Sequence, residues 1–429
     1  MAIRSSAVAR IVASRNLEGF WVARSATRFC VKLAALGLLA TLGITLVMPK
    51  ILSSAPLHIR HDAQLVVVAL GISSCFVVAA SGAIGAYLGQ ERLLGPGVLV
   101  VTTKTIGALA VIVLAHRGYG LLALGFIWAS VTMAVPILLI LRMLFSRAAV
   151  PTDLSSTEVS ASVRSFAHTF SLWAFAGFLV SGLDTTIVAH FSYTQAAPYA
   201  LGAVLPLLLH GGATAAMAPL IPKISRLQAN LTDGREIALQ TLGYVRTNTA
   251  FFTFLVTPLL AWSPGIATLL TGKSSNLVAT VLSLLLIATW LRLSIYPFAL
   301  AVLALDDHHV ARPLPLAEGL GNLSSSLVLG AAYGAKGVAI GTIIGAGAGV
   351  LANQSYLVPR LKCMTIDDKL ALIKPLLRWL PLMLCGTGCG FLNALQVVGA
   401  VPLALALTIV VAFLAARQLV VQHQAARRR

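Results

Sequence analysis

The chain has 429 residues, of which 58% are hydrophobic and only 10% are charged. A water-soluble domain of this length cannot cover its surface with so few charged residues, so the composition excludes a soluble enzyme or a soluble binding protein. The net charge of +18 is spread over short loops and forms no basic face interleaved with aromatic residues, which argues against a nucleic-acid partner.

Apolar runs of about 20 residues recur along the whole chain, which is the length that an α-helix needs to cross a hydrocarbon core of about 30 Å. The sequence therefore predicts an all-α, polytopic membrane protein with about twelve transmembrane helices. The predicted spans are residues 33–51, 65–88, 96–115, 120–142, 167–190, 198–220, 249–271, 277–304, 313–333, 337–357, 378–395 and 397–416.

The distribution of basic residues predicts the orientation of these spans. If they alternate from a cytoplasmic N-terminus, about 24 of the 31 Lys and Arg residues lie on the cytoplasmic side. This bias is the one that membrane proteins show in their cytoplasmic loops, so we expect both termini to be cytoplasmic. Residues 1–32 are too basic and too interrupted for a cleavable signal peptide, and we expect a cytoplasmic segment there.

An internal repeat relates the two parts of the chain. An offset of about 216 residues superposes Gly118 on Gly334 and Gly125 on Gly341, and it matches span, charged turn, span, tight glycine turn and span in the same order. Two related bundles are a common transporter architecture, with the substrate between them.

The same offset predicts the domain organisation. The spans at 167–190 and 198–220 have no counterparts, because these would precede Met1, so we expect the first bundle to lack two helices. Either the chain starts inside a longer reading frame or it is a naturally shortened form. The predicted domains are an incomplete N-terminal bundle of about four helices (1–150), a six-helix bundle (151–362), and an additional helix pair with a basic tail (363–429).

Three stretches carry a family resemblance: LDTTIVAHFSYTQAAPYALGAVL (183–205), MAPLIPKISR (217–226) and EGLGNLSSSLVLGAAYGAKGVAIGTIIG (318–345). They are similar to polysaccharide flippases of the Wzx type, in the superfamily (MOP) that also holds MurJ lipid II flippases and MATE exporters. In that family the first stretch is an Asp-bearing helix, a short loop and a Tyr-bearing helix. The last is an acidic helix start, an Asn and a Gly-x-x-Gly turn.

The resemblance implies a function and a location. Such a protein moves a polyprenyl-diphosphate-linked oligosaccharide from the cytoplasmic to the outer leaflet of the bacterial inner membrane by alternating access. Its partners are the lipid-linked glycan, the bilayer, and a glycan polymerase with its chain-length machinery. No cofactor is implied, apart from coupling to H⁺ or Na⁺.

Four charged residues are the candidate substrate-binding residues, because charge within a span is costly and is retained for a function or a partner. Lys104 lies mid-span in VVTTKTIGALAV, and Arg292 lies near the middle of LLLIATWLRLSIYPFALAVL. Asp184 lies about six residues from the outer end of its span, and Glu318 lies near the inner end of its own.

These residues suggest a hydrated cleft in which Lys104 and Arg292 bind the diphosphate, since phosphoryl oxygens accept several charge-assisted hydrogen bonds. Asp184 and Glu318 then either restrain these cations when the cleft is empty or bind the H⁺ or Na⁺ that drives the return step. The alternative is structural: interhelical salt bridges, or charges close to a helix end.

Two other functions compete with a flippase. A membrane glycan polymerase or ligase typically carries a large outer loop, whereas the predicted outer loops are short and present no pair of carboxylates. We therefore expect no enzyme. A MATE-like exporter of small organic molecules is the closer alternative. A cation exporter should favour buried acids, and the two deep bases here favour an anionic substrate. The five cysteines are scattered and indicate neither a disulfide framework nor a metal site.

Overall fold

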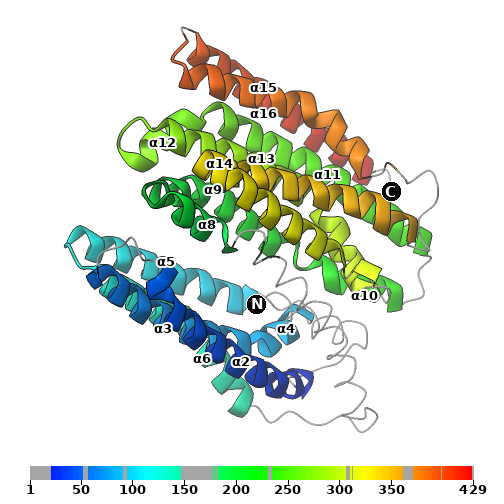
Figure 1. Cartoon of the computed structure of the whole chain (residues 1–429). Helices are drawn as coiled ribbons and strands as arrows, with labels where there is room; N and C mark the ends of the chain where they lie inside the picture. Colours follow the sequence, from blue (N-terminus) through cyan, green and yellow to red (C-terminus); the bar gives the residue numbers. More distant parts are fainter. Residues whose placement is uncertain are drawn as a thin grey trace. The chain divides into compact units, whose positions relative to one another are not determined.

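The computed structural model describes residues 21–51, 57–89, 94–145, 177, 179, 182–229, 234–305, 310–311, 313–360, 370, 372–397 and 399–427 (Figure 1). Every regular element in these ranges is helical, which confirms the all-α fold. The helices are α2 (Trp21–Ile51), α3 (Leu57–Ala79), α4 (Ser81–Gly89), α5 (Leu94–His116), α6 (Leu121–Phe145), α8 (Asp184–Phe191), α9 (Tyr193–Met217), α10 (Leu220–Ala229), α11 (Gly234–Ala261), α12 (Ser263–Thr271), α13 (Asn276–Ala304), α14 (Pro313–Ala352), the π-helix η3 (Asn353–Leu357), the short 3₁₀ turn η4 (Val358–Arg360), α15 (Ile373–Ala394) and α16 (Ala400–Arg427).

Many of these helices are long and apolar enough to cross a membrane. By length and composition, the described residues hold seven such helices, or eight if the bent pair α11–α12 counts as one span. The stretch Pro313–Arg360 counts as one of these helices, although α14 reverses direction within it. The apolar parts of α2 and α16 are shorter than the 18 residues that a candidate span requires, so they are not counted. The count of twelve spans stays a prediction.

The chain divides into two compact units. Unit 1 is Met1–Ser171 with Ile221–Asn230, and unit 2 is Leu172–Leu220 with Leu231–Arg429. The predicted domain boundaries after residues 150 and 362 lie outside the described residues, as does most of the predicted span 167–190. The boundaries and the expected absence of two helices before Met1 therefore stay predictions.

Unit 1 is built around α3, which packs on α2 and α6, while α5 packs on α6. The chain turns between α5 and α6 at Gly118, which has a positive φ of 81°. A Cβ at Gly107 of α5 would lie 2.6 Å from the Val131 side chain of α6, so the two helices approach closely at this glycine.

Unit 2 is built around α13, which contacts α9, α11, α12, α14 and α15. Of the most apolar part of α13, 67% is buried, whereas the same measure for α5 is 6%. Trp290 anchors α13 to α11 by donating its indole N–H to Thr253 at 2.9 Å, and Asn248 of α11 donates to the carbonyl of Leu293. These bonds fix the rotation of α13 about its own axis.

Helix α14 is a hairpin of two antiparallel helices that meet at Gly334, where φ is 59° and ψ is −136°. Its second half carries glycine at every fourth position, at 337, 341, 345 and 349. A Cβ on Gly345 would lie 2.6 Å from the Cβ of Asn322, and one on Gly349 would lie 2.7 Å from the Glu318 carboxylate. The glycines therefore allow the two halves to pack almost backbone to backbone.

One predicted span is broken. Residues 249–271 were expected to form a continuous helix, but α11 and α12 meet at an angle of 66° at Trp262. Pro264 lies in the first turn of α12 and has no backbone N–H to continue the ladder of α11. Both α15 and α16 pack on α11, so the C-terminal helix pair belongs to unit 2.

Candidate functional site

A partly open cavity of about 250 Å³ lies in unit 2 and is lined mainly by α8, α9, α13 and α14. One face of α13 supplies its floor, with side chains spaced alternately by four and three residues, which is the spacing of a single helical stripe. The stripe consists of Leu285, Thr289, Arg292, Tyr296 and Ala299. Arg292 points into the cavity, while Trp290 on the opposite side of α13 is bonded to Thr253 of α11.

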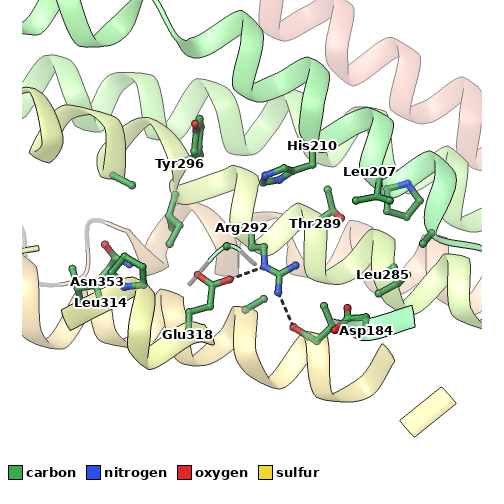
Figure 2. Close-up of a pocket in the computed structure, with 18 of the residues that line it drawn as sticks. Asp184, Leu207, His210, Leu285, Thr289, Arg292, Tyr296, Leu314, Glu318 and Asn353 are labelled. Carbon is green, nitrogen blue, oxygen red and sulfur yellow. Dashed lines mark hydrogen bonds and ion pairs between the residues drawn. The ribbon is translucent and has the colours of Figure 1, made fainter. Parts of the chain in front are cut away.

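Arg292 forms an ion pair with Glu318 of α14 (Figure 2). Its Nε–H donates to Glu318 Oε1 at 2.6 Å, and one Nη2–H donates to the carbonyl of Thr342 at 3.5 Å. The two side chains are 15% and 21% exposed, so the pair is largely shielded from solvent. A guanidinium has five N–H donors, and within the described part of the chain three of those of Arg292 have no protein acceptor.

Asp184 is the second charged centre of the cavity and is only 5% exposed. Its carboxylate accepts hydrogen bonds from the Tyr199 hydroxyl at 3.2 Å, the Thr342 hydroxyl at 3.2 Å and the Asn322 amide at 3.3 Å. It also occupies the first turn of α8, where the helix dipole favours a negative charge. Arg292 is near enough for the two charges to interact. The three hydrogen bonds, the helix dipole and the charge of Arg292 offset part of the desolvation cost of a carboxylate within a span.

The glycine spacing of α14 brings these groups together. Asn322 and Glu318 lie one turn apart on the first half of the hairpin, opposite Gly345 and Gly349, while Thr342 follows Gly341 on the second half. Because the two halves are in close contact, both can face Asp184 and Arg292 at once.

Of the four predicted site residues, the structure brings Asp184, Arg292 and Glu318 into one cavity. Lys104 lies in unit 1, on α5, where its side chain is exposed and its ammonium lies 5.7 Å from the centre of the Trp128 ring. A role in substrate binding stays a prediction for all four.

The sequence did not single out Thr342, Thr289 or Tyr296 as parts of this site. Tyr199, Asn322 and Thr342 all fall in the stretches that carry the family resemblance, the first two on the Tyr-bearing helix and as the Asn after the acidic helix start. Thr342 could have been found from the repeated glycines around it, which indicate a helix face in close contact with a partner. Among the described residues no group of three or more His, Cys, Asp or Glu side chains is placed to hold a metal ion.

Comparison with known proteins gives a fold but no family. No protein-family model matches the chain, and no curated protein is significantly similar to it. Among solved structures, a mutant of the Vibrio cholerae MATE transporter VcmN matches with a TM-score of 0.61 and 18% identity, over 83% of each chain. The lipid II flippase MurJ, in an inward closed conformation, matches with a TM-score of 0.63 and 14% identity, over 97% of this chain and 88% of MurJ.

A third structure, an outward-facing multidrug resistance MATE family transporter of the MOP superfamily, matches with a TM-score of 0.53 and 15% identity, over 89% of this chain and 83% of the transporter. The protein thus shares the fold of these MATE transporters and of the lipid II flippase MurJ. With its apolar helices, this fold makes it a multi-pass membrane protein.

Proposed function

We propose that this protein is a flippase of the Wzx type, which moves a polyprenyl-diphosphate-linked oligosaccharide from the cytoplasmic to the outer leaflet of the bacterial inner membrane by alternating access. Its termini are cytoplasmic in this proposal, and a glycan polymerase with its chain-length machinery would use the product. The observation that carries the proposal is Arg292, a guanidinium in the middle of α13 that faces a cavity with three N–H donors open.

Arg292 suits a diphosphate for two reasons. A planar guanidinium donates two parallel hydrogen bonds to a phosphate, and it stays charged even when it is shielded from water. Glu318 supplies the negative charge that Arg292 needs while the cavity is empty, and it leaves enough donors for a phosphate to bind alongside. Lys104 of unit 1 is the proposed second cation for the diphosphate.

We further propose that Asp184 binds the coupling ion, H⁺ or Na⁺. Its carboxylate lies among the hydroxyl groups of Tyr199 and Thr342, and these oxygens can turn their lone pairs toward a cation or keep donating to the carboxylate. The carbonyl of Thr342 also accepts a hydrogen bond from Arg292. Binding of an ion at Asp184 would therefore act on the proposed phosphate site through a single residue, Thr342.

A second candidate function has its own support. The cavity holds two carboxylates, Asp184 and Glu318, and one guanidinium, so its formal charge is negative. A negative cavity fits an organic cation, and this favours a MATE-like, ion-coupled exporter of small molecules.

Complementation separates the two functions. In a bacterium that lacks its own polysaccharide flippase, expression of the chain should restore surface glycan, and Arg292→Ala should abolish this rescue at an unchanged membrane level. Arg246→Ala is the matched control, because Arg246 is exposed on α11 and does not line the cavity. Transport into proteoliposomes under an imposed H⁺ or Na⁺ gradient identifies the coupling ion.

If the chain confers resistance to cationic dyes and does not restore surface glycan, the exporter function replaces the proposed flippase function. Full glycan rescue by Arg292→Ala would remove Arg292 from the substrate site.

A further inference from the structure

Beside Arg292, the cavity carries two aromatic side chains from different helices. Tyr296 follows Arg292 by one turn of α13, and His210 comes from α9. Their ring centres lie 6.4 Å apart in an edge-to-face arrangement. In Figure 2 the His210 ring lies beside the Arg292 side chain, with Tyr296 further along α13.

Several polar atoms near these two rings have no hydrogen-bond partner among the described residues. Within the part of the chain that the structure describes, the Tyr296 hydroxyl, the Thr289 hydroxyl and the His210 ring nitrogens form no hydrogen bond, although all three side chains line the cavity. Because these three side chains line the same cavity as Arg292, their polar atoms are available to a polar ligand or to water.

Rings flanked by open donors and acceptors favour one class of ligand. A pyranose has an apolar C–H face, which packs on an aromatic ring, and hydroxyl groups at its edge, which need donors and acceptors. The separation also fits, because Tyr296 lies one helical turn, roughly 6 Å, from Arg292. The sugar directly attached to a diphosphate held by Arg292 would reach Tyr296.

The size and layout of the cavity limit what it holds. Its volume of about 250 Å³ is below the roughly 300–1,000 Å³ of pockets that enclose a whole drug-sized ligand. His210 lies three turns of α9, roughly 16 Å, from Tyr199, which contacts Asp184. The aromatic pair is therefore separate from Asp184, and Arg292 with its partner Glu318 lies between them (Figure 2).

From these observations we infer that Tyr296 and His210 form a subsite for the first sugar of a diphosphate-linked glycan. The inference rests on the proposed flippase function and deepens it. Arg292 binds the diphosphate of any such lipid, whereas the aromatic subsite distinguishes a lipid that carries a sugar from one that does not.

The test compares two ligands on the purified full chain in nanodiscs. One is undecaprenyl diphosphate, and the other is the same lipid carrying a single sugar, supplied as glucose, galactose and N-acetylglucosamine. The unmodified protein should bind at least one sugar-bearing lipid about tenfold more tightly than the bare lipid. Tyr296→Ala should remove this preference and leave the affinity for the bare lipid unchanged, and Tyr296→Phe should retain part of it.

Tyr333→Ala is the matched control, because Tyr333 is 66% exposed at the turn of α14 and lies outside the cavity. It should change neither affinity. Equal loss of both lipids in Tyr296→Phe, or an intact sugar preference in Tyr296→Ala, overturns the subsite while Arg292 keeps its role. Binding of tetraphenylphosphonium that depends on Tyr296, without any sugar preference, assigns the rings to an organic cation. If the unmodified protein binds neither lipid, the flippase function itself is wrong.

Discussion

Two hairpins that correspond in the predicted internal repeat both turn at a glycine with a positive φ but pack differently. The chain reverses at Gly118 between α5 and α6 in unit 1, and at Gly334 within α14 in unit 2, and both glycines have a positive φ. Yet 39% of the most apolar part of the α14 stretch is buried, against 6% for α5 and 28% for α6. One glycine, Gly107, brings α5 close to α6, whereas five glycines of α14 lie in such close contact with its other half: 330, 337, 341, 345 and 349.

This difference in packing goes with a difference in how the two hairpins hold their charged side chains. The close contact in α14 fixes Glu318 and Asn322 against a neighbouring backbone, and it turns both toward α13 and α8. On α5, near the repeat-equivalent position of Glu318, Lys104 is exposed, and its ammonium lies 5.7 Å from the centre of the Trp128 ring. The α14 hairpin positions a charged network, whereas Lys104 on α5 is an exposed cation beside an aromatic ring.

Breaking the glycine contact of α14 should have the largest effect on stability. In Gly337→Ala the new methyl group would overlap the carbonyl oxygen of Leu329, which belongs to the backbone and cannot move aside. We expect a loss of more than about 3 kcal/mol, because overpacking against backbone exceeds the usual cost of an extra methyl group. The apparent melting temperature in detergent, measured by the loss of monodisperse protein, reports it.

Gly347→Ala is the control on the same half of α14, since a Cβ there meets nothing within 4 Å. It should leave the melting temperature unchanged or raise it slightly, because alanine favours the helix. Equal effects of the two substitutions would mean that the halves of α14 are not in close contact.

Sequence periodicity was enough to predict the helices of this fold, since most apolar runs became helices at the expected places. The bend at Trp262 was not predicted, because a proline in a helical pattern indicates a kink without giving its angle. Nor can an apolar run by itself show that Pro313–Arg360 folds back on itself; the glycine turn at 334 had to be identified for that.

Only the charged residues of the candidate site could be predicted from the sequence. Arg292, Asp184 and Glu318 stand out because charge is rare in spans, but hydroxyl and amide groups are common there and do not stand out. Thr342 and Thr289 are two threonines among many, and their place in the cavity depends on helix rotation. That rotation is set by long-range contacts such as the bond from Trp290 to Thr253.

The charges of the two hairpins should differ in their effect on stability. Glu318→Ala leaves Arg292 without its paired carboxylate in a shielded position, and we expect a loss of roughly 3 kcal/mol, the lower end for a broken buried pair. Lys104→Ala removes an exposed side chain and should change stability by no more than about 0.5 kcal/mol. The melting temperatures of the two variants in the same detergent test this. A similar loss in both would show that Lys104 has a structural partner and would remove the contrast between the hairpins.

The smallest expected difference in stability is the one between substitutions at the two turn glycines, Gly118 and Gly334. At Gly118 a Cβ meets open space, so Gly118→Ala costs only the backbone strain of a positive φ, about 1–2 kcal/mol. At Gly334 a Cβ would also lie 2.6 Å from Gln195 Oε1, which accepts a hydrogen bond from the Ala335 N–H at 2.9 Å. Gly334→Ala should therefore cost roughly 1 kcal/mol more, the worth of that bond.

A double-mutant cycle isolates the contribution of Gln195. In a Gln195→Ala background the clash and the bond are both absent, so Gly334→Ala should cost no more there than its own backbone strain. Melting temperatures of the four proteins of the cycle, with Gly118→Ala as the reference, give the coupling. If the coupling is zero, the unusual ψ of −136° at Gly334 accounts for the whole excess, because side chains avoid that region even where space is free. The two turns would then differ in backbone geometry and not in their neighbours.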